Sequence, residues 1–220
     1  TIHLIEVAQS IIKLQEAEGI DDAALVPVVD WFAGYLEWLT THPFGIDERE
    51  AKNNHGTCWV MQVAAFAKLT NNQVWMDYCR QRYKTVLLPG QMAVDGSFPL
   101  ETPRTKPYGY SLFNLDAMAT ICQILSTDHD NLWEYETDCG RSIKRGIEFL
   151  LPYVIDKSNW PFQEDVMYWD EWPVAHAFLL FSALQFNDEE QFHIWKNLER
   201  HPETDEVIRN MPIRNPIIWF

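Results

Sequence analysis

Two short segments of the chain carry the side chains best suited to chemistry. The first is residues 52–59, with the sequence KNNHGTCW, and the second is residues 104–110, with the sequence RTKPYGY. Together they supply amides, an imidazole, a guanidinium and two phenols. These groups can neutralise a sugar carboxylate while a proton leaves the carbon beside it and a glycosidic oxygen departs. That elimination requires no metal ion and no cofactor, and we expect neither.

Four residues of these segments are the candidates for catalysis. Removing the proton at C5 of a uronate builds negative charge on its carboxylate, which the amide of Asn54 and the guanidinium of Arg104 would stabilise. An unperturbed imidazole is largely neutral at working pH, so His55 can accept the proton, whereas a phenol must first be made more acidic by nearby cations. Arg104 could act on Tyr110 in this way. The same phenol, when protonated, can hand its proton to the glycosidic oxygen.

Five further residues are candidates for binding the substrate. Four come from the two segments and one from a later predicted helix: Asn53, Trp59, Lys106, Tyr108 and His176. Tyr108 also competes with Tyr110 as the proton donor, and we favour Tyr110.

Several of these candidates have a structural alternative that the sequence leaves open. Asn53 can act as the N-cap of a helix. Arg104 can pair with Glu101 or Asp95. Tyr108 can be a packing residue or a platform for a sugar ring. Lys106 either holds a second anionic group or is an ordinary surface residue.

The charge of the chain restricts its partners. With 17 Lys and Arg against 32 Asp and Glu, the formal net charge is −15. Nucleic-acid binding depends on clustered Lys and Arg, and no such stripe is present, so we exclude nucleic acid as the main partner. An acidic polysaccharide would have to be met by a local cationic site, which Arg104 and Lys106 could form. The oligomeric state is left open.

Length, apolar runs and cysteines bound the class of protein. A chain of 220 residues is ordinarily one domain. No apolar run approaches the roughly 18 residues of a membrane span, and the chain begins at Thr1 without a basic-then-apolar leader. We expect a mature form or the C-terminal part of a longer protein, secreted or periplasmic. The four cysteines lie in no metal-ligand spacing, so zinc is not expected, and disulfides are permitted but not required.

The apolar residues follow a helical period along nearly the whole chain. A turn containing His42 and Pro43 should break the second helix, and the stretch 89–107 should be a long functional loop. Pro173 fits the first turn of its helix. The expected helices cover residues 2–19, 21–41, 55–69, 73–83, 110–125, 138–155, 173–186 and 188–199.

Eight helices in four successive hairpins, without strand alternation, predict an all-α fold. The favoured architecture is an α/α toroid, incomplete or partial, in which helix pairs stack around a central cleft. The alternative is a compact irregular bundle. Both chemical segments lie where a loop leads into a helix. Because helix N-termini present free N–H groups and partial positive charge, this placement favours an anionic ligand.

The two segments resemble those of the alginate lyase superfamily of polysaccharide lyases. The likeness rests on Asn-Asn-His near a helix start, followed by an Arg and by Tyr-Gly-Tyr-Ser-Leu-Phe-Asn-Leu, and it extends from about Trp31 to Leu125. The resemblance implies an α/α-toroid catalytic domain that cleaves an alginate-like or polyglucuronate polymer. By the same resemblance, Asn54, His55 and Arg104 hold the carboxylate or take the proton, and Tyr110 donates to the leaving oxygen.

Two other functions remain as alternatives. A glycoside hydrolase on the same fold would use two carboxylates, such as Asp116 with Asp170 or Glu171, as acid and base. A non-catalytic module would bind carbohydrate or protein through its aromatic rim, to which the tryptophan-rich stretches 160–164 and 168–172 could contribute.

Overall fold

The apolar helical period produces an all-α structure, as expected. The computed structural model describes residues 1–220 apart from the side chain of Asp22. Within that description there are no strands, only two isolated β-bridges. The α-helices are α1 (Leu4–Glu16), α2 (Asp22–Thr41), α3 (Pro43–Glu50), α4 (Asn54–Leu69), α5 (Gln73–Arg82), α6 (Leu88–Gln91), α7 (Pro107–Leu125), α8 (Ile143–Ile155), α9 (Ala177–Phe186), α10 (Glu189–Asn197) and α11 (Asp205–Arg209).

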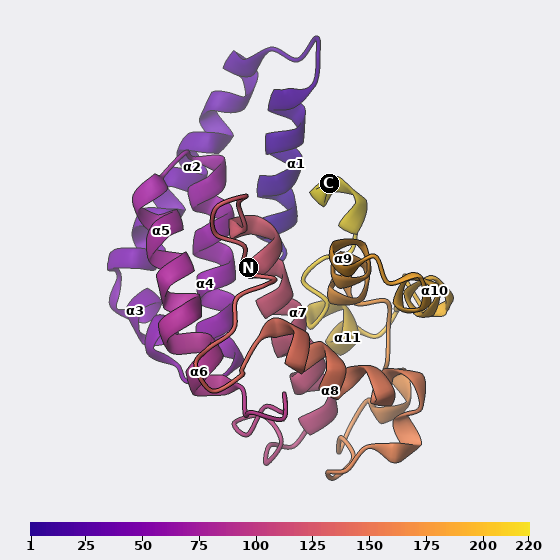
Figure 1. Cartoon of the computed structure of the whole chain (residues 1–220). Helices are drawn as coiled ribbons and strands as arrows, with labels where there is room; N and C mark the ends of the chain where they lie inside the picture. The colour runs from indigo at the N-terminus through magenta and orange to yellow at the C-terminus, as the bar shows by residue number, and fades with distance from the viewer.

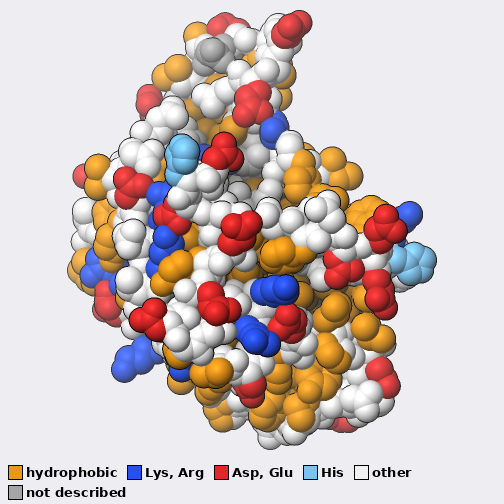
Figure 2. All heavy atoms as spheres, in the orientation of Figure 1, with side chains coloured by type: hydrophobic (Ala, Val, Ile, Leu, Met, Phe, Trp, Pro, Cys, Tyr) orange, Lys and Arg blue, Asp and Glu red, His pale blue; other side chains and the backbone are white. Residues whose placement is uncertain are grey.

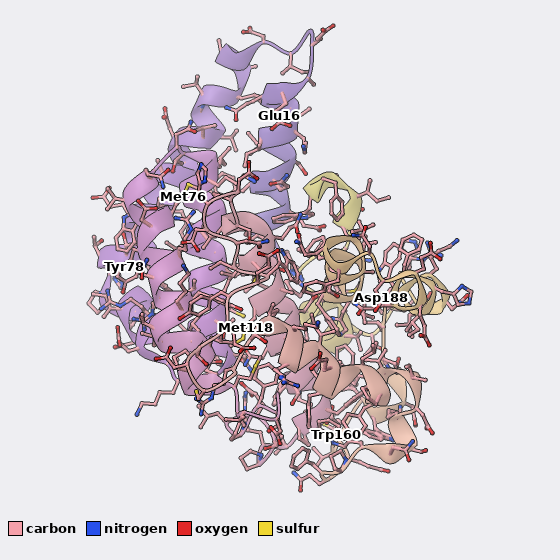
Figure 3. The ribbon with its side chains drawn as sticks, viewed as in Figure 1. Glu16, Met76, Tyr78, Met118, Trp160 and Asp188 are labelled. Carbon is pink, nitrogen blue, oxygen red and sulfur yellow. The ribbon has the colours of Figure 1, made fainter. Side chains whose placement is uncertain are left out.

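Two helices form the centre of the molecule. In both α4 and α7, almost every residue is buried, on all sides of the helix. A helix that is apolar all round must be surrounded by other elements. Here α1, α2, α3 and α5 contact α4, while α8 and α9 contact α7, and α4 packs directly on α7 (Figure 1). Met118, labelled in Figure 3, is fully buried on α7.

The four predicted helix pairs are each in contact: α1 with α2, α4 with α5, α7 with α8, and α9 with α10. The additional helices are short. A π-helical segment, Tyr83–Leu87, joins α5 to α6, and 3₁₀ turns cover Lys157–Asn159, Trp169–Glu171 and Pro216–Trp219. Among the residues that the structure describes, none of the helices is long and apolar enough to cross a membrane.

The turn at His42 and Pro43 ends α2 at Thr41, as expected. The sequence analysis did not expect the helix that follows: the fixed φ of Pro43 suits a first turn and opens α3, where His42 Nδ1 accepts the backbone N–H of Phe44. Three other expected boundaries were wrong. The helix expected over residues 138–155 begins only at Ile143. The stretch 89–107 begins with the end of α6, so its irregular part starts at Met92. The helix expected from Pro173 begins only at Ala177.

The late start of α9 has a tertiary cause. The N–H of Ala175 donates to the carbonyl of Glu199, which holds this segment in an extended conformation beside the end of α10. Asp116 of α7 then accepts the backbone N–H of Phe178 at 2.7 Å. A carboxylate 62 residues away in sequence thus caps the first turn of α9.

The cysteines and the charged surface complete the description. Cys58, Cys79 and Cys122 are buried and free, and Cys139 is exposed and free. Figure 2 shows acidic side chains scattered over the visible face, with lysines and arginines between them. Apolar side chains gather on the same face over the region of α8 and the segment that follows it.

Candidate active site

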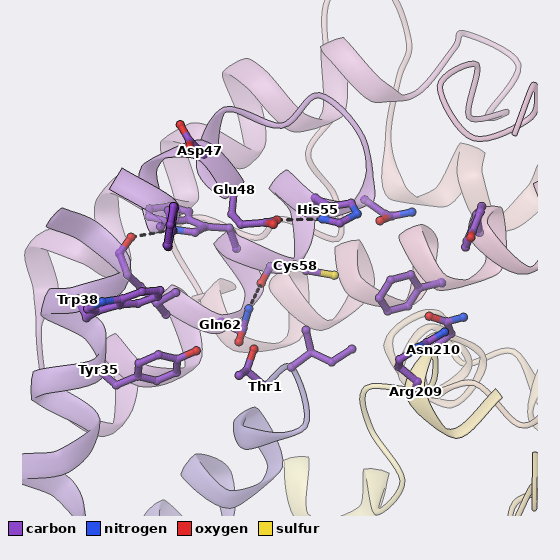
Figure 4. Close-up of a pocket in the computed structure, with 18 of the residues that line it drawn as sticks. Thr1, Tyr35, Trp38, Asp47, Glu48, His55, Cys58, Gln62, Arg209 and Asn210 are labelled. Atoms are coloured by element: carbon purple, nitrogen blue, oxygen red, sulfur yellow. Dashed lines mark hydrogen bonds and ion pairs between the residues drawn. The ribbon is translucent and has the colours of Figure 1, made fainter. Parts of the chain in front are cut away.

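All four residues proposed for catalysis line one cleft. The cleft has a volume of about 830 Å³ and lies between α2, α3, α4, α7, α11 and the irregular segment before α7 (Figure 4). Asn54 and His55 come from the first turn of α4, Arg104 from the irregular segment, and Tyr110 from the first turn of α7. Other lining residues include Tyr35, Trp38, Phe44, Asp47, Glu48, Trp59, Gln62, Glu206, Arg209 and Asn210.

The start of α4 is set by a sharp connection from α3. Asn53 is the N-cap, and its side chain accepts the backbone N–H of His55 at 3.3 Å. A Cβ on Gly56 would lie 2.2 Å from the carbonyl oxygen of Ala51, so only glycine allows the backbones to approach this closely. Asn53, which was proposed to bind substrate, therefore acts as the N-cap of α4 and does not line the cleft.

His55 is oriented by a carboxylate from α3. Its Nδ1 lies 2.9 Å from Oε2 of Glu48, and both side chains are about half exposed. Because a carboxylate only accepts hydrogen bonds, the neutral imidazole places its proton on Nδ1, which leaves the Nε2 lone pair available as a base. Glu48 is a functional candidate that the sequence analysis missed, since residues 42–45 were expected to break the chain and not to begin a helix.

A buried carboxylate joins the two chemical segments. Glu101 is fully buried and accepts three hydrogen bonds. Two come from Asn54, from its backbone N–H at 2.8 Å and from its side-chain Nδ2 at 3.1 Å, and the third comes from Nη1 of Arg104 at 2.7 Å. Burial raises the pKa of this carboxyl, while the hydrogen bonds from Arg104 and Asn54 act in the opposite direction. The pairing of Arg104 is thus with Glu101, whereas Asp95 accepts the N–H and hydroxyl of Ser97.

Tyr110 lies in the cleft beside two cations. The guanidinium carbon of Arg104 is 3.9 Å from the centre of its ring, and Nζ of Lys106 is 5.1 Å away. Cations at this range of an aromatic face are attracted by the ring. Lys106 itself forms an ion pair with Glu206 and does not line the cleft, so its contribution to the site is indirect.

Tyr108 lies in the core, outside the cleft. Its side chain is fully buried, and its hydroxyl donates to the carbonyl of Tyr153 at 2.9 Å. Burial raises the pKa of this phenol. Its ring packs edge-on against Trp160 and Trp169, in the aromatic cluster around the Trp160 labelled in Figure 3. Of its two proposed roles, packing is the one that this position allows.

His176 and Asp116 form a buried pair away from the cleft. Both side chains are fully buried, with His176 Nδ1 lying 3.3 Å from Asp116 Oδ2. The His176 ring also stacks on Trp172, with ring centres 5.5 Å apart. His176 therefore cannot touch a substrate in the cleft. The hydrolase alternative is not favoured, because Asp116 is buried in this pair and occupied in capping α9.

The wall opposite α7 is aromatic. Trp59 is almost fully buried, donates its indole N–H to the carbonyl of Leu39, and lines the bottom of the cleft. Trp38 is 41% exposed and Phe44 is 69% exposed. Tyr35 stacks on Trp38 at 6.0 Å between ring centres. Flat, partly exposed rings of this kind suit the faces of sugar rings.

Within the described residues, no cluster of three or more His, Cys, Asp or Glu has the arrangement of a metal site.

Comparisons with known proteins point in one direction. A family model described as alginate lyase matches residues 1–160. The fold is also similar to the crystal structure of an alginate lyase from Bacteroides ovatus, with a TM-score of 0.72 and 28% sequence identity. That match covers 91% of this chain and 53% of the other, so this chain spans about half the length of that protein. A comparison with curated proteins found no match.

Proposed function

We propose, from the premise that this chain belongs to the alginate lyase family, that it cleaves a uronate-containing polysaccharide by β-elimination in this cleft. One observation carries the proposal. Asn54, His55, Arg104 and Tyr110 come from segments about fifty residues apart and line the same cleft, with Glu101 bonded to both Asn54 and Arg104. We also propose a secreted or periplasmic location.

The first step is neutralisation of the uronate carboxylate. Asn54 uses one hydrogen of its Nδ2 on Glu101, which leaves the other for the substrate. Arg104 likewise gives one of its five N–H groups to Glu101 and keeps others free. Because Glu101 is buried and fixes both side chains, these donors are preorganised for the charge that develops on the carboxylate as C5 loses its proton.

The second step is transfer of two protons. His55 Nε2 accepts the C5 proton, the C5 electron pair forms the C4–C5 double bond, and the bond from C4 to the glycosidic oxygen breaks. Tyr110 donates its hydroxyl proton to that oxygen. Tyr110, which lies beside Arg104 and Lys106, is the competing base, with His55 as its helper. In either case the product carries an unsaturated uronate at its new non-reducing end.

The test is direct incubation with candidate polymers. Alginate, polyglucuronate and glycosaminoglycans would each be mixed with the protein while the absorbance of the unsaturated uronate is followed. We expect a rise with at least one polyuronate and almost none with the Tyr110→Phe variant. A hydrolase would release new ends without the absorbance, and a binding module would retain polymer without either. No rise with any of the polymers would overturn the proposal.

A further inference from the structure

The cleft is also lined by Arg209, a cationic residue that is not one of the four catalytic candidates. Arg209 and Asn210, at the end of α11, line the same cleft as His55 and Arg104. In Figure 4 they lie away from Tyr35 and Trp38, with His55 between the two groups. The family match ends at residue 160, so this wall comes from a part of the chain that the family model does not reach.

Arg209 is held in place and remains accessible. Its side chain is 69% exposed. Its Nη2 donates to Oε2 of Glu206, whose side chain is buried, with 6% exposed. Glu206 Oε1 accepts from Lys106 and from Nδ2 of Asn210 at 3.1 Å. Only one N–H of the guanidinium is used in these bonds, so its other donors are free for a ligand.

Arg209 is the cation of this wall that a ligand can reach. Lys106 and Arg209 both pair with the carboxylate of Glu206, and Lys106 also interacts with the carboxyl of Asp165. The opposite lip of the cleft carries Asp47 and Glu48, which would repel a carboxylate. A guanidinium that is fixed on one side and open on the other is well suited to bind a carboxylate through two parallel N–H bonds.

We propose that Arg209 binds the carboxylate of a second sugar, next to the one whose carboxylate meets Asn54 and Arg104. This inference rests on the proposed function, because it takes the substrate to be a polymer with a carboxylate on the neighbouring sugar. The polymer would lie along the cleft, with its acid groups toward α7 and α11. The rings of Trp38 and Tyr35 would line the other end of its path.

The test measures binding in the Tyr110→Phe background, where the ligand is not cleaved. Calorimetry would give the affinity of a saturated mannuronate trisaccharide for this parent, for its Arg209→Ala derivative and for its Arg145→Ala derivative. Arg145 is a matched control, because it forms the same i,i+3 pair, with Glu148, outside the cleft. Losing a charge-assisted hydrogen bond should weaken trisaccharide binding by about tenfold or more with Arg209→Ala, and Arg145→Ala should match the parent.

Two further ligands separate charge from packing. A single uronate, which fills only one position, should bind the parent and the Arg209→Ala derivative equally. A trisaccharide with its carboxyls reduced to alcohols should also bind them equally. Arg209→Lys should recover part of the affinity for the acidic trisaccharide. Equal trisaccharide affinity in parent and Arg209→Ala, an equal loss in Arg145→Ala, or no binding by the parent would each overturn the proposal.

The same experiment keeps this inference separate from the proposed lyase reaction. If Arg209→Ala weakens trisaccharide binding while the unmodified chain gives no unsaturated product, the second position stands and the lyase function falls. If the unmodified chain cleaves the polymer and Arg209→Ala leaves KM unchanged, the lyase function stands and the second position falls.

Discussion

Tyr108 and Tyr110 show how two residues of one type acquire different roles. Residues two apart on a helix point to different sides of it. On α7 this places the Tyr108 ring among Trp160 and Trp169, and the Tyr110 ring in the cleft beside Arg104. The backbone direction at the start of α7 therefore decides which phenol can meet a substrate.

At the scale of single residues, we predict that one Tyr→Phe substitution lowers activity and the other lowers stability. Tyr110→Phe removes the proposed proton donor and should lower kcat/KM on a polyuronate by about 100-fold or more. Tyr108→Phe removes one buried hydrogen bond, to Tyr153, and should lower the free energy of unfolding by about 1 kcal/mol with activity retained. Steady-state kinetics and denaturant unfolding of both variants check this. Loss of activity in Tyr108→Phe with a stable fold would contradict the assignment.

At the scale of elements, the junction of α3 and α4 determines where Asn54 and His55 lie. Glu48 near the end of α3 contacts His55 in the first turn of α4, and Gly56 permits the close approach of the two helices. The same turn brings the backbone N–H of Asn54 to Glu101. A displacement of this junction would move both side chains relative to Arg104 and Tyr110 in the cleft.

Gly56→Ala tests the junction. Its new methyl group would lie 2.2 Å from the carbonyl oxygen of Ala51, so we expect a loss of roughly 1–3 kcal/mol in the free energy of unfolding, together with a lower kcat. Gly90→Ala is the control, because nothing lies within 4 Å of its added Cβ. It should leave activity unchanged and stability equal or slightly higher. Equal stability of the two variants in denaturant unfolding would refute this account of the junction.

The start of α7 makes stability depend on pH. The buried Asp165 carboxyl accepts the backbone N–H groups of Tyr108 and Gly109, and burial raises its pKa above the ordinary 3.8 despite these bonds. The folded protein therefore holds this proton to a higher pH than the unfolded chain does. The resulting contribution to the free energy of unfolding is fully present below the unfolded pKa and is lost as pH rises through the folded pKa.

Asp165→Asn isolates this effect, because asparagine does not titrate. We expect the free energy of unfolding of the wild type, minus that of the variant, to decrease as pH rises through the range just above 3.8 and then to level off. Denaturant unfolding of both proteins over a series of pH values measures the difference. A difference that increases with pH would show that the two N–H bonds outweigh burial.

At the scale of the whole molecule, the net charge of −15 would repel the proposed polyanionic substrate, whereas the cations of the cleft would attract it. The two effects act over different distances. The overall repulsion operates at long range and is screened first, whereas Arg104 and Arg209, which line the cleft, would act on the proposed substrate at short range. The Debye length falls from about 30 Å at 0.01 M salt to about 3 Å at 1 M, which spans both regimes.

We therefore expect KM for a polyuronate to pass through a minimum as ionic strength rises. Added salt should first lower KM by screening the overall repulsion, and then raise it by weakening the contacts in the cleft. Initial rates over a salt series at constant pH measure this. A KM that rises steadily from the lowest ionic strength would mean that the cationic cleft, and not the net charge, governs association throughout.

Much of the fold and the four catalytic candidates could be predicted from the sequence, because helical period and helix starts are local properties. The period of apolar residues located α1, α2, α4, α5, α7, α8, α9 and α10, with α9 beginning later than expected. The motif residues Asn54, His55, Arg104 and Tyr110 were selected by their chemistry and their place near helix starts. The pairing of Arg104 with Glu101 was one of two alternatives left open.

Tertiary structure decided which groups meet. Helix packing brings Glu48 of α3 to His55 of α4. It also brings Glu101 to the side chain of Asn54, 47 residues away in sequence, and Arg209 to the cleft. The same packing removed Tyr108 and His176 from the site by burying them. By itself, the sequence determined the helices and the chemical groups they carry. Only packing could decide their convergence, because burial of α4 and α7 fixes helix positions that no local pattern encodes.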